Sequence, residues 1–419
     1  MLDFGEEPMP LKPGEYALEV RSDRLWIEAW TDDRTLSRRI ISVDEHATGV
    51  LDCSVHRFGG TPAKLTFLDL ERPQTAHRRL SGTRRSFGEQ FRRMLTRQFP
   101  GWEIATLTTG MDLQRSFSPV FPRARLLLGG QQIAAMACPS LPNENELLTF
   151  ALLWFHHLRR ADRSTSLALF LPETAGCLTA HRLRWLDSEV LRPRLFRFNE
   201  HGSAGEVDAE DLGNLDTRVA ASGEPVLRKE PLLARRADEY ALEGAVRSTV
   251  KLLAADLLSK PVHSQVISFG GLDRDAIDLL AMSDSGRLCV IELKATEDIH
   301  LPIQALDYWV RTNWHAERGE LAHLFPGIPI AAVAAKLMLV APALAFHPAN
   351  ATVLRYFRSC IDVERIGVNS NWENELRVVL RLRGADGPQS HGSSYEYSSQ
   401  SPEYQEGDFE SQSGTGSTA

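Results

Sequence analysis

Two short apolar segments separated by a polar turn form the clearest pattern in the chain. Residues 276–282 (AIDLLAM) and 288–293 (LCVIEL) are rich in apolar and β-branched side chains, and SDSG at 283–286 has turn-forming composition. This pattern predicts a β-hairpin. If its turn is centred on Ser285, Asp278 lies directly opposite Glu292, with the two Cβ atoms about 5 Å apart. Because side chains alternate along a strand, Lys294 projects on the same side as Glu292.

The rest of the chain alternates between strand-like and helix-like patterns. Residues 1–75 predict a small β-rich unit. The elements predicted next are a helix near 87–98, a strand near 102–107, a hairpin over 125–136, a helix near 147–158, a strand at 167–172 and a helix near 181. The same order recurs after residue 240, ending in a strand at 337–342, a helix near 353–358 and strands near 361–368 and 376–382. We therefore predict an α/β protein.

The domains expected from these patterns are a β-rich unit at 1–75, an α/β domain at 76–225, a second α/β domain at 226–384 and an acidic, low-complexity, disordered tail at 385–419. The tail's six acidic residues account for six of the eight net negative charges of the 419-residue chain. The rest of the chain is therefore close to neutral, so its net charge does not argue against binding to nucleic acid.

Three further features limit the class of protein. Five scattered cysteines without Cys-x-x-Cys spacing predict a reducing, cytoplasmic location and argue against structural zinc. The N-terminal residues lack the features of a signal peptide. The longest apolar stretch, Ile330 to Phe346, is broken by Lys336 and Pro342, so it predicts a helix end followed by a core strand and no membrane span.

Two carboxylates that face each other between apolar strands repel unless a cation lies between them. Mg²⁺ prefers one or two carboxylates together with waters and phosphate oxygens, and Asp278 and Glu292 offer that set, with the Leu293 carbonyl nearby. Lys294 would then orient or deprotonate a water, or neutralise charge in the transition state. The alternative is that Glu292 and Lys294 form an ordinary salt bridge and Asp278 has no special task. Lys294 is the only lysine with an acidic residue two positions before it, which favours the metal site.

Asp278-Leu279-Leu280, the turn, and Val290-Ile291-Glu292-Leu293-Lys294 resemble the core motif of the PD-(D/E)xK, or restriction-endonuclease-like, nucleases over roughly residues 235–384. The resemblance implies a mixed sheet flanked by helices, with Asp278, Glu292 and Leu293 at Mg²⁺ or Mn²⁺ and Lys294 serving the attacking water. It also implies that Glu243 and Gln304 support the metal or the phosphate. Glu239 is the alternative to Glu243 for the acidic residue on this helix. Where the family name has Pro-Asp, this chain has Ile277-Asp278.

If the two α/β halves are equivalent, Met136 stands in the place of Glu292, Cys138 in that of Lys294, and Arg125 near that of Asp278. Such a first copy cannot hold Mg²⁺. We interpret it as a degenerate nuclease-like domain that binds substrate or mediates formation of a homodimer. The alternative is an unrelated α/β domain.

Positive charge gathers between Arg72 and Arg97 and predicts a phosphate-contacting stripe, or else a solvated helix face. Its candidate DNA contacts are Arg78, Arg79, Arg84, Arg85, Arg92 and Arg93. The predicted function is a metal-dependent endonuclease, a hydrolase of DNA phosphodiester bonds acting in repair, recombination or defence. The alternatives are a catalytically silent nucleic-acid-binding scaffold and a nuclease that cleaves RNA. Tyr308, Trp309 and Trp314 either stack on bases or belong to the core.

Overall fold

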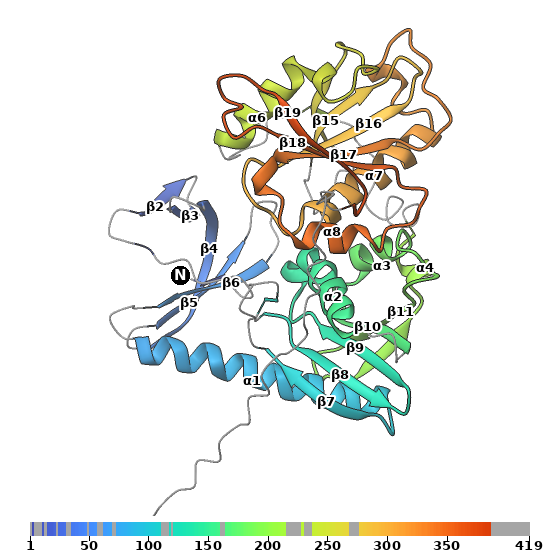
Figure 1. Cartoon of the computed structure of the whole chain (residues 1–419). Helices are drawn as coiled ribbons and strands as arrows, with labels where there is room; N and C mark the ends of the chain where they lie inside the picture. The colour runs from blue at the N-terminus through green and yellow to red at the C-terminus, as the bar shows by residue number, and fades with distance from the viewer. Residues whose placement is uncertain are drawn as a thin grey trace, which may run out of the picture. The chain divides into compact units, whose positions relative to one another are not determined.

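The computed structural model shows an α/β protein with three β-sheets and, in the residues it describes, seven α-helices (Figure 1). Those residues are 2–3, 11, 15–21, 24–30, 35–47, 50–56, 62–68, 73–109, 117–118, 120–159, 164–214, 228–229, 237–267 and 276–386. Met1–Asp386 form one unit and Gly387–Ala419 a second. The predicted tail at 385–419 lies almost entirely outside the described residues, which end at Asp386.

The first sheet is antiparallel throughout, with the order β1-β6-β5-β4-β3-β2. Its strands are β1 (Leu2–Asp3), β2 (Tyr16–Arg21), β3 (Arg24–Trp30), β4 (Thr35–Ala47), β5 (Val50–His56) and β6 (Pro62–Leu68). Alternate residues of β3, Ile27 and Ala29, are buried in its small core, as expected for a sheet with one covered face.

The second sheet has the order β12-β11-β10-β9-β8-β7. In chain order its elements are α1 (Pro73–Gln98), β7 (Glu103–Thr108), β8 (Arg123–Leu128), β9 (Gln131–Ala137), α2 (Glu144–Leu158), β10 (Ser164–Pro172), α3 (Cys177–Leu183), β11 (Pro193–Phe198), β12 (Ala204–Val207) and α4 (Ala209–Leu212). We name residues 73–214 the first α/β region.

The third sheet has the order β13-β14-β15-β16-β17-β18-β19. Its elements are β13 (Arg228–Lys229), α6 (Ala237–Ser248), β14 (His263–Ile267), β15 (Ala276–Met282), β16 (Leu288–Leu293), α7 (Leu301–Glu317), β17 (Lys336–Pro342), α8 (Ala349–Leu354), β18 (Val363–Val368) and β19 (Val378–Arg383). We name residues 237–386 the second α/β region.

The two α/β regions share one topology. Strands β7 to β12 pair in the sequence antiparallel, antiparallel, parallel, parallel, antiparallel, and β14 to β19 repeat this sequence without change. The helices also correspond, because α1 and α6 precede the first strand, α2 and α7 follow the third, and α3 and α8 follow the fourth. The predicted recurrence of elements is therefore present in the structure.

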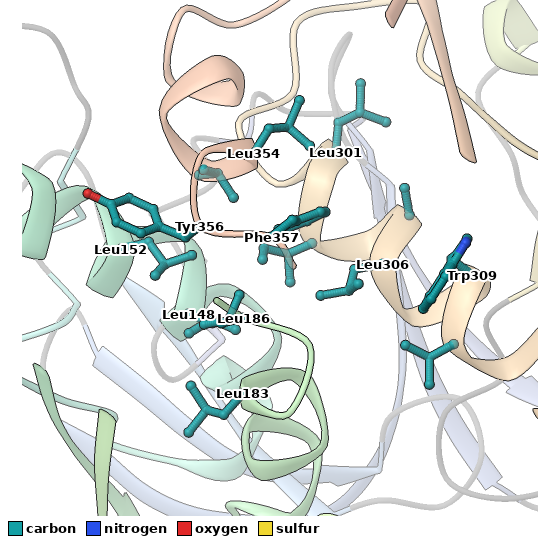
Figure 2. Packing of buried hydrophobic residues seen from close by; sticks show 14 of the residues in the cluster. Leu148, Leu152, Leu183, Leu186, Leu301, Leu306, Trp309, Leu354, Tyr356 and Phe357 are labelled. Carbon is teal, nitrogen blue, oxygen red and sulfur yellow. The ribbon is translucent and has the colours of Figure 1, made fainter. Parts of the chain in front are cut away.

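Both faces of each α/β sheet are covered. The side chains of α1 pack on one face of the second sheet, and those of α6 pack on one face of the third. The other faces share a single core with α2, α3, α7 and α8, in which α2 contacts α8 and α3 contacts α7. Figure 2 shows leucines of all four helices meeting Tyr356 and Phe357 there. Burial of these apolar side chains joins the two regions, at roughly 1.5–3 kcal/mol per large side chain.

One ion pair lies inside this shared core. The Arg182 guanidinium of α3 binds the Asp307 carboxylate of α7 through two nitrogens, with Nη2 2.6 Å from Oδ2 and Nε 3.0 Å from Oδ1. Arg182 Nη1 also donates to the backbone oxygen of Asn145 at 2.8 Å. Although burial raises the pKa of Asp307, the charge and hydrogen bonds of Arg182 outweigh it and hold this pKa below its ordinary value. Asp307 is therefore ionised in the core.

Three sequence predictions need correction. The helix expected near 353–358 is α8, Ala349–Leu354, with Pro348 as its N-cap residue. The helix expected from 87 begins at Pro73 as α1. No helix end precedes β17 within 330–335, where the described backbone is bent. None of the described helices is long and apolar enough to span a membrane.

Candidate active site

The β15–β16 hairpin has the register that the sequence predicts. Leu279 lies opposite Ile291 and Met282 opposite Leu288, so the turn is centred on Ser285. The next position along each strand is Asp278 on β15 and Glu292 on β16. The register therefore directs both carboxylates to the same end of the same two strands.

The turn fixes this register through local contacts. Ser283 N–H donates to the Arg287 oxygen at 2.9 Å, and Arg287 N–H donates to Ser283 Oγ at 3.1 Å. Gly286 has a φ of +79°, and a Cβ there would lie 2.3 Å from the Pro329 oxygen. Only glycine meets both conditions without displacing the backbone. The turn residues thus determine which side chains of β15 and β16 face each other.

The turn therefore places Asp278 and Glu292 on facing strands. Asp278 Oδ2 accepts a hydrogen bond from the Leu293 backbone N–H at 2.8 Å, so the carboxylate is held against β16 where the ladder of paired residues ends. Asp278 and Glu292 are each only 2% exposed. Burying two carboxylates on adjacent strands costs free energy that a cation or hydrogen-bond donors must offset.

The Lys294 ammonium lies between two carboxylates. Its Nζ is 3.8 Å from Glu292 Oε1 and 3.7 Å from Asp298 Oδ2. Its backbone N–H donates to the Val340 oxygen at 3.0 Å, which anchors the residue to β17. The contact with Glu292 is the salt bridge that the alternative interpretation expects. It also places the amine beside the buried Glu292 carboxylate, so this contact is compatible with both interpretations.

Sequence reasoning missed Asp298, which fixes the loop between β16 and α7. Asp298 Oδ1 accepts a hydrogen bond from the His300 backbone N–H at 2.7 Å, and its backbone oxygen accepts one from Asn350 Nδ2 at 3.2 Å. Asn350 is fully buried on α8. The four-residue spacing of Lys294 and Asp298 could have suggested their contact from the sequence. Nothing in the sequence pointed to Asn350, because its side chain belongs to a distant helix.

Gln304 lies in the first turns of α7, one turn after His300. Its backbone N–H donates to the His300 oxygen at 3.1 Å. Its side-chain Oε1 is buried and makes no hydrogen bond to the described residues, and the same holds for His300 Nδ1. Two polar atoms without partners among the described residues, at the start of α7, are suited to hydrogen bonding with a water.

His300 is held in its neutral form. Burial lowers its pKa to about 4, the Asp298 charge opposes this shift, and the Arg182 and Lys294 charges add to it. The His300 ring also packs edge-on against Phe150 of α2, with the centroids 5.2 Å apart. The first α/β region therefore supports the loop that leads from Lys294 into α7.

Glu243 is buried on α6 and is only 4% exposed, so it is not a solvated helix residue. Its competitor, Glu239, is partly exposed. Leu242 and Val246 of the same helix pack with the odd-numbered residues of β16, whereas α7 packs with the even-numbered ones. The structure thus places Glu243 and Gln304 on helices that cover opposite faces of the sheet.

The aromatic residues of α7 belong mainly to the core. Trp309 is 1% exposed, and its Nε1 donates to the Ala335 oxygen at 2.7 Å. Tyr308 is also buried. The ring of Trp314 lies 3.7 Å from the Arg318 guanidinium carbon. Packing, rather than an open stacking platform, accounts for Tyr308 and Trp309.

The corresponding end of the first α/β region has the same backbone arrangement. Cys138 N–H donates to the Phe170 oxygen at 2.8 Å, as Lys294 N–H does to the Val340 oxygen at 3.0 Å. Met136 pairs with Leu169 of β10, as Glu292 pairs with Leu339 of β17. Met136 and Cys138 therefore occupy the positions expected for them.

The residue opposite Met136 is Arg123, two residues before Arg125, which the sequence analysis placed near the position of Asp278. Leu128 pairs with Gln131, so Gly129 and Gly130 form a two-residue turn, and this turn is centred one residue earlier than a pairing of Arg125 with Met136 would require. A shift of one residue in the centre of a turn moves the opposite partner by two. Arg125 instead lies opposite Ala134.

Arg123 puts a positive charge where the second α/β region has Asp278. Its side chain is buried, and its guanidinium carbon lies 4.5 Å from the ring centroid of Phe117 and 5.6 Å from that of Trp154. Burial also raises the pKa of the Cys138 thiol well above its ordinary value, which keeps the thiol protonated. At these matched positions the first α/β region therefore has neither the carboxylate pair nor the amine of the second.

The predicted arginine stripe follows α1. Arg92 and Arg93 are exposed, on the opposite side of the helix from the buried Phe91, Met94 and Leu95. The side chains of Arg78, Arg79, Arg84 and Arg85 lie outside the described residues. The described part of the stripe is therefore accessible to a phosphate backbone.

The donor set at the hairpin can be compared with the needs of a metal ion. Within the ranges that the structure describes, no group of three or more His, Cys, Asp or Glu side chains is placed to hold one. Mg²⁺ requires fewer protein ligands, since one or two carboxylates with waters and phosphate oxygens suffice. Asp278 and Glu292, with the Leu293 carbonyl, fit that requirement in chemistry. The five cysteines form no disulfide. No family model, curated protein or solved structure matches the chain.

Proposed function

We propose that the chain is a Mg²⁺- or Mn²⁺-dependent nuclease that hydrolyses phosphodiester bonds in DNA, with one active site at the Asp278 end of the β15–β16 hairpin. The observation that carries the proposal is a pair of carboxylates, each 2% exposed, on two adjacent core strands at the first position beyond their last paired residues. A pair of this kind is costly to bury and has an evident use in holding a divalent cation.

The surrounding fold supports the same proposal. The sheet of β14 to β19 is mixed, with α6 on one face and α7 and α8 on the other. This is the arrangement expected from the resemblance to the PD-(D/E)xK nucleases. Glu243 and Gln304 lie on the two helices that the resemblance assigns to them, and their roles in catalysis are part of the proposal.

The chemistry of the site can be divided among its side chains. Asp278 and Glu292 would hold the ion, which supplies charge neutralisation at the scissile phosphate and a more acidic water. Lys294 would orient that water or take its proton, and its ammonium would otherwise offset negative charge in the transition state. Asp298 would position Lys294, since its carboxylate lies 3.7 Å from Nζ and is itself held by the loop. Gln304 Oε1 would accept a hydrogen bond from a water.

A catalytically silent nucleic-acid-binding scaffold is the second candidate. Two observations favour it: the positions of the first α/β region that match Asp278 and Glu292 lack carboxylates, and Arg92 and Arg93 are exposed on α1. Both observations also suit a nuclease that binds its substrate through the first α/β region. RNA is an alternative substrate, because the proposed contacts are to phosphate and water, which DNA and RNA complexes share.

The test compares DNA cleavage by wild type, Lys294→Ala and Cys138→Ala in Mg²⁺ or Mn²⁺, with an RNA control. These two substitutions lie at corresponding ends of β16 and β9, so they form a matched pair. We expect Lys294→Ala to lose roughly 10²- to 10⁴-fold in rate, as is usual for a group that serves proton transfer, and Cys138→Ala to cleave like wild type. If all three proteins bind DNA in a salt-sensitive way and none cleaves it, the scaffold is the better assignment.

A further inference from the structure

Two reciprocal hydrogen bonds join the α/β regions beyond α3 and α8. Asp187 N–H donates to the Tyr356 oxygen at 2.8 Å, and Arg358 N–H donates to the Trp185 oxygen at 3.0 Å. Between them Leu186 pairs with Phe357 in an antiparallel bridge. The two hydrogen bonds are symmetric. The residue after Leu186 donates to the residue before Phe357, and the residue after Phe357 donates to the residue before Leu186. A local two-fold axis therefore passes through this bridge.

The side chains around the bridge repeat the symmetry. Trp185 packs edge-on against Trp309 of α7, with centroids 4.9 Å apart and planes at 79°. Tyr356 packs edge-on against Phe155 of α2, with centroids 5.5 Å apart and planes at 75°. The helix contacts follow the same rule, since α3 contacts α7 and α2 contacts α8. In an isologous two-fold interface each contact between i and j recurs between j and i, and this chain reproduces that arrangement internally.

The symmetry places the first α/β region where a second nuclease subunit would lie in a two-fold dimer. The backbones of a DNA duplex are also related by two-fold axes, so a symmetric protein with two active sites can address both strands. Here the position related to Asp278 holds Arg123, and the position related to Glu292 holds Met136. Only one of the two related positions has the carboxylates that the proposed chemistry needs.

From this asymmetry we infer that the chain acts on duplex DNA as a single-strand nicking enzyme, a two-fold assembly within one chain that cuts once per binding event. The inference rests on the proposed nuclease function. In the reaction, the oxygen of one water bonds to one phosphorus, the bond from that phosphorus to one bridging oxygen breaks, and the leaving oxygen takes up a proton. The facing strand stays intact, because the related positions hold Arg123 and Met136 in place of the carboxylates that the reaction needs.

The experiment uses the full chain, Mg²⁺ and a supercoiled plasmid, and follows open-circular and linear DNA from the first turnovers. We expect nearly all early product to be open circles, with linear DNA appearing only later as nicks accumulate. Cys138→Ala should give the same product ratio as wild type, and Lys294→Ala should give neither product. The molecular mass of the protein in solution is measured at the same concentration, with the monomer at 46.8 kDa.

The outcomes separate the two levels of the proposal. Linear DNA that forms as fast as the supercoiled form disappears would overturn the nicking inference but would leave the nuclease function standing. If the protein then also had a dimeric mass, a second active site from another chain would explain the double-strand cut. Cleavage of single-stranded DNA with no nicking of the duplex would also overturn the inference. Absence of every product with wild type would remove the nuclease function itself.

Discussion

The ends of β9 and β16 share the same backbone pairing with the next parallel strand but carry different side chains at the three matched positions. Each is followed by a residue whose N–H donates to the neighbouring parallel strand of its sheet, Cys138 in one case and Lys294 in the other. Arg123 pairs with Met136 across β8 and β9, whereas the corresponding positions of β15 and β16, just beyond their last pair, hold Asp278 and Glu292. The same sheet topology therefore carries the proposed cation site in the second α/β region and the Arg123 guanidinium at the matched position of the first.

The difference shows that the fold supplies positions and the side chains supply chemistry. In the first α/β region the charge of Arg123 lies over two aromatic rings and needs no metal. In the second, the buried acids require a cation from solution or from Lys294. Substitutions at matched positions therefore compare side-chain contributions within the same sheet topology.

The largest expected effect concerns the Arg182–Asp307 pair, which has no counterpart across the two-fold axis. Counting from the symmetric aromatic residues, Leu153 stands in the place of Asp307 and Val353 in that of Arg182. Asp307→Leu leaves the Arg182 charge buried without its carboxylate and should lower the free energy of unfolding by about 3–5 kcal/mol. Urea denaturation measures this change.

The double variant Arg182→Val with Asp307→Leu copies the opposite side of the interface and should recover much of the loss. A double variant as unstable as the single one would show that the ion pair, and not the stranded charge, carries the stability. Because the folded pKa of Asp307 is depressed, its contribution is present above the unfolded value of about 3.9 and is lost as pH falls through the folded pKa.

The second prediction addresses the metal. Mg²⁺ should raise the melting temperature of wild type, because an ion that binds only the folded state stabilises it by about 2.7 kcal/mol at a hundred times its dissociation constant. Asp278→Asn should abolish this shift, whereas Arg123→Met, at the related position, should retain it. Each variant is compared with its own metal-free melting curve by differential scanning fluorimetry. An equal Mg²⁺ shift in Asp278→Asn would place the ion elsewhere.

The third prediction concerns pH. The pKa of His300 is about 4 in the folded chain and about 6.5 in an unfolded one, so between these values the unfolded chain binds more protons. Stability contributed by the neutral ring should therefore fall as pH decreases through this window, with a slope approaching about 1.4 kcal/mol per pH unit. His300→Gln should show a shallower dependence. Parallel curves for the two proteins would mean that His300 titrates normally.

The smallest effect is expected at the exposed arginines of α1. If Arg92 and Arg93 bind phosphates, replacing both with alanine should reduce the slope of log K against log salt by about 0.9 for each phosphate that is no longer neutralised. Fluorescence anisotropy with a labelled duplex at several salt concentrations gives this slope. A matched variant is Arg194→Ala, whose side chain pairs with Glu206 at 2.6 Å on β12 and should leave the slope unchanged.

Much of this architecture could be predicted from the sequence because its signals are local. The turn at 283–286 and the flanking apolar runs determine the register of β15 and β16, and the recurrence of strands and helices is visible in their order. The sequence analysis placed Arg125, rather than Arg123, near the position that matches Asp278. The difference arose because composition alone does not specify the centre of a glycine turn to one residue. Asp298 and Asn350 were missed because their contact joins segments about fifty residues apart, and the symmetry around Leu186 and Phe357 depends on tertiary packing.

Joining the two regions in one polypeptide has a consequence for how their interface can change. In a dimer of identical subunits every substitution appears twice, and a new charge must find a partner on both sides of the axis. Within a single chain the tether keeps the two regions at high effective concentration, so each position can vary once and alone. Arg182 and Asp307 could thus arise on one side of the axis while Val353 and Leu153 stayed apolar on the other.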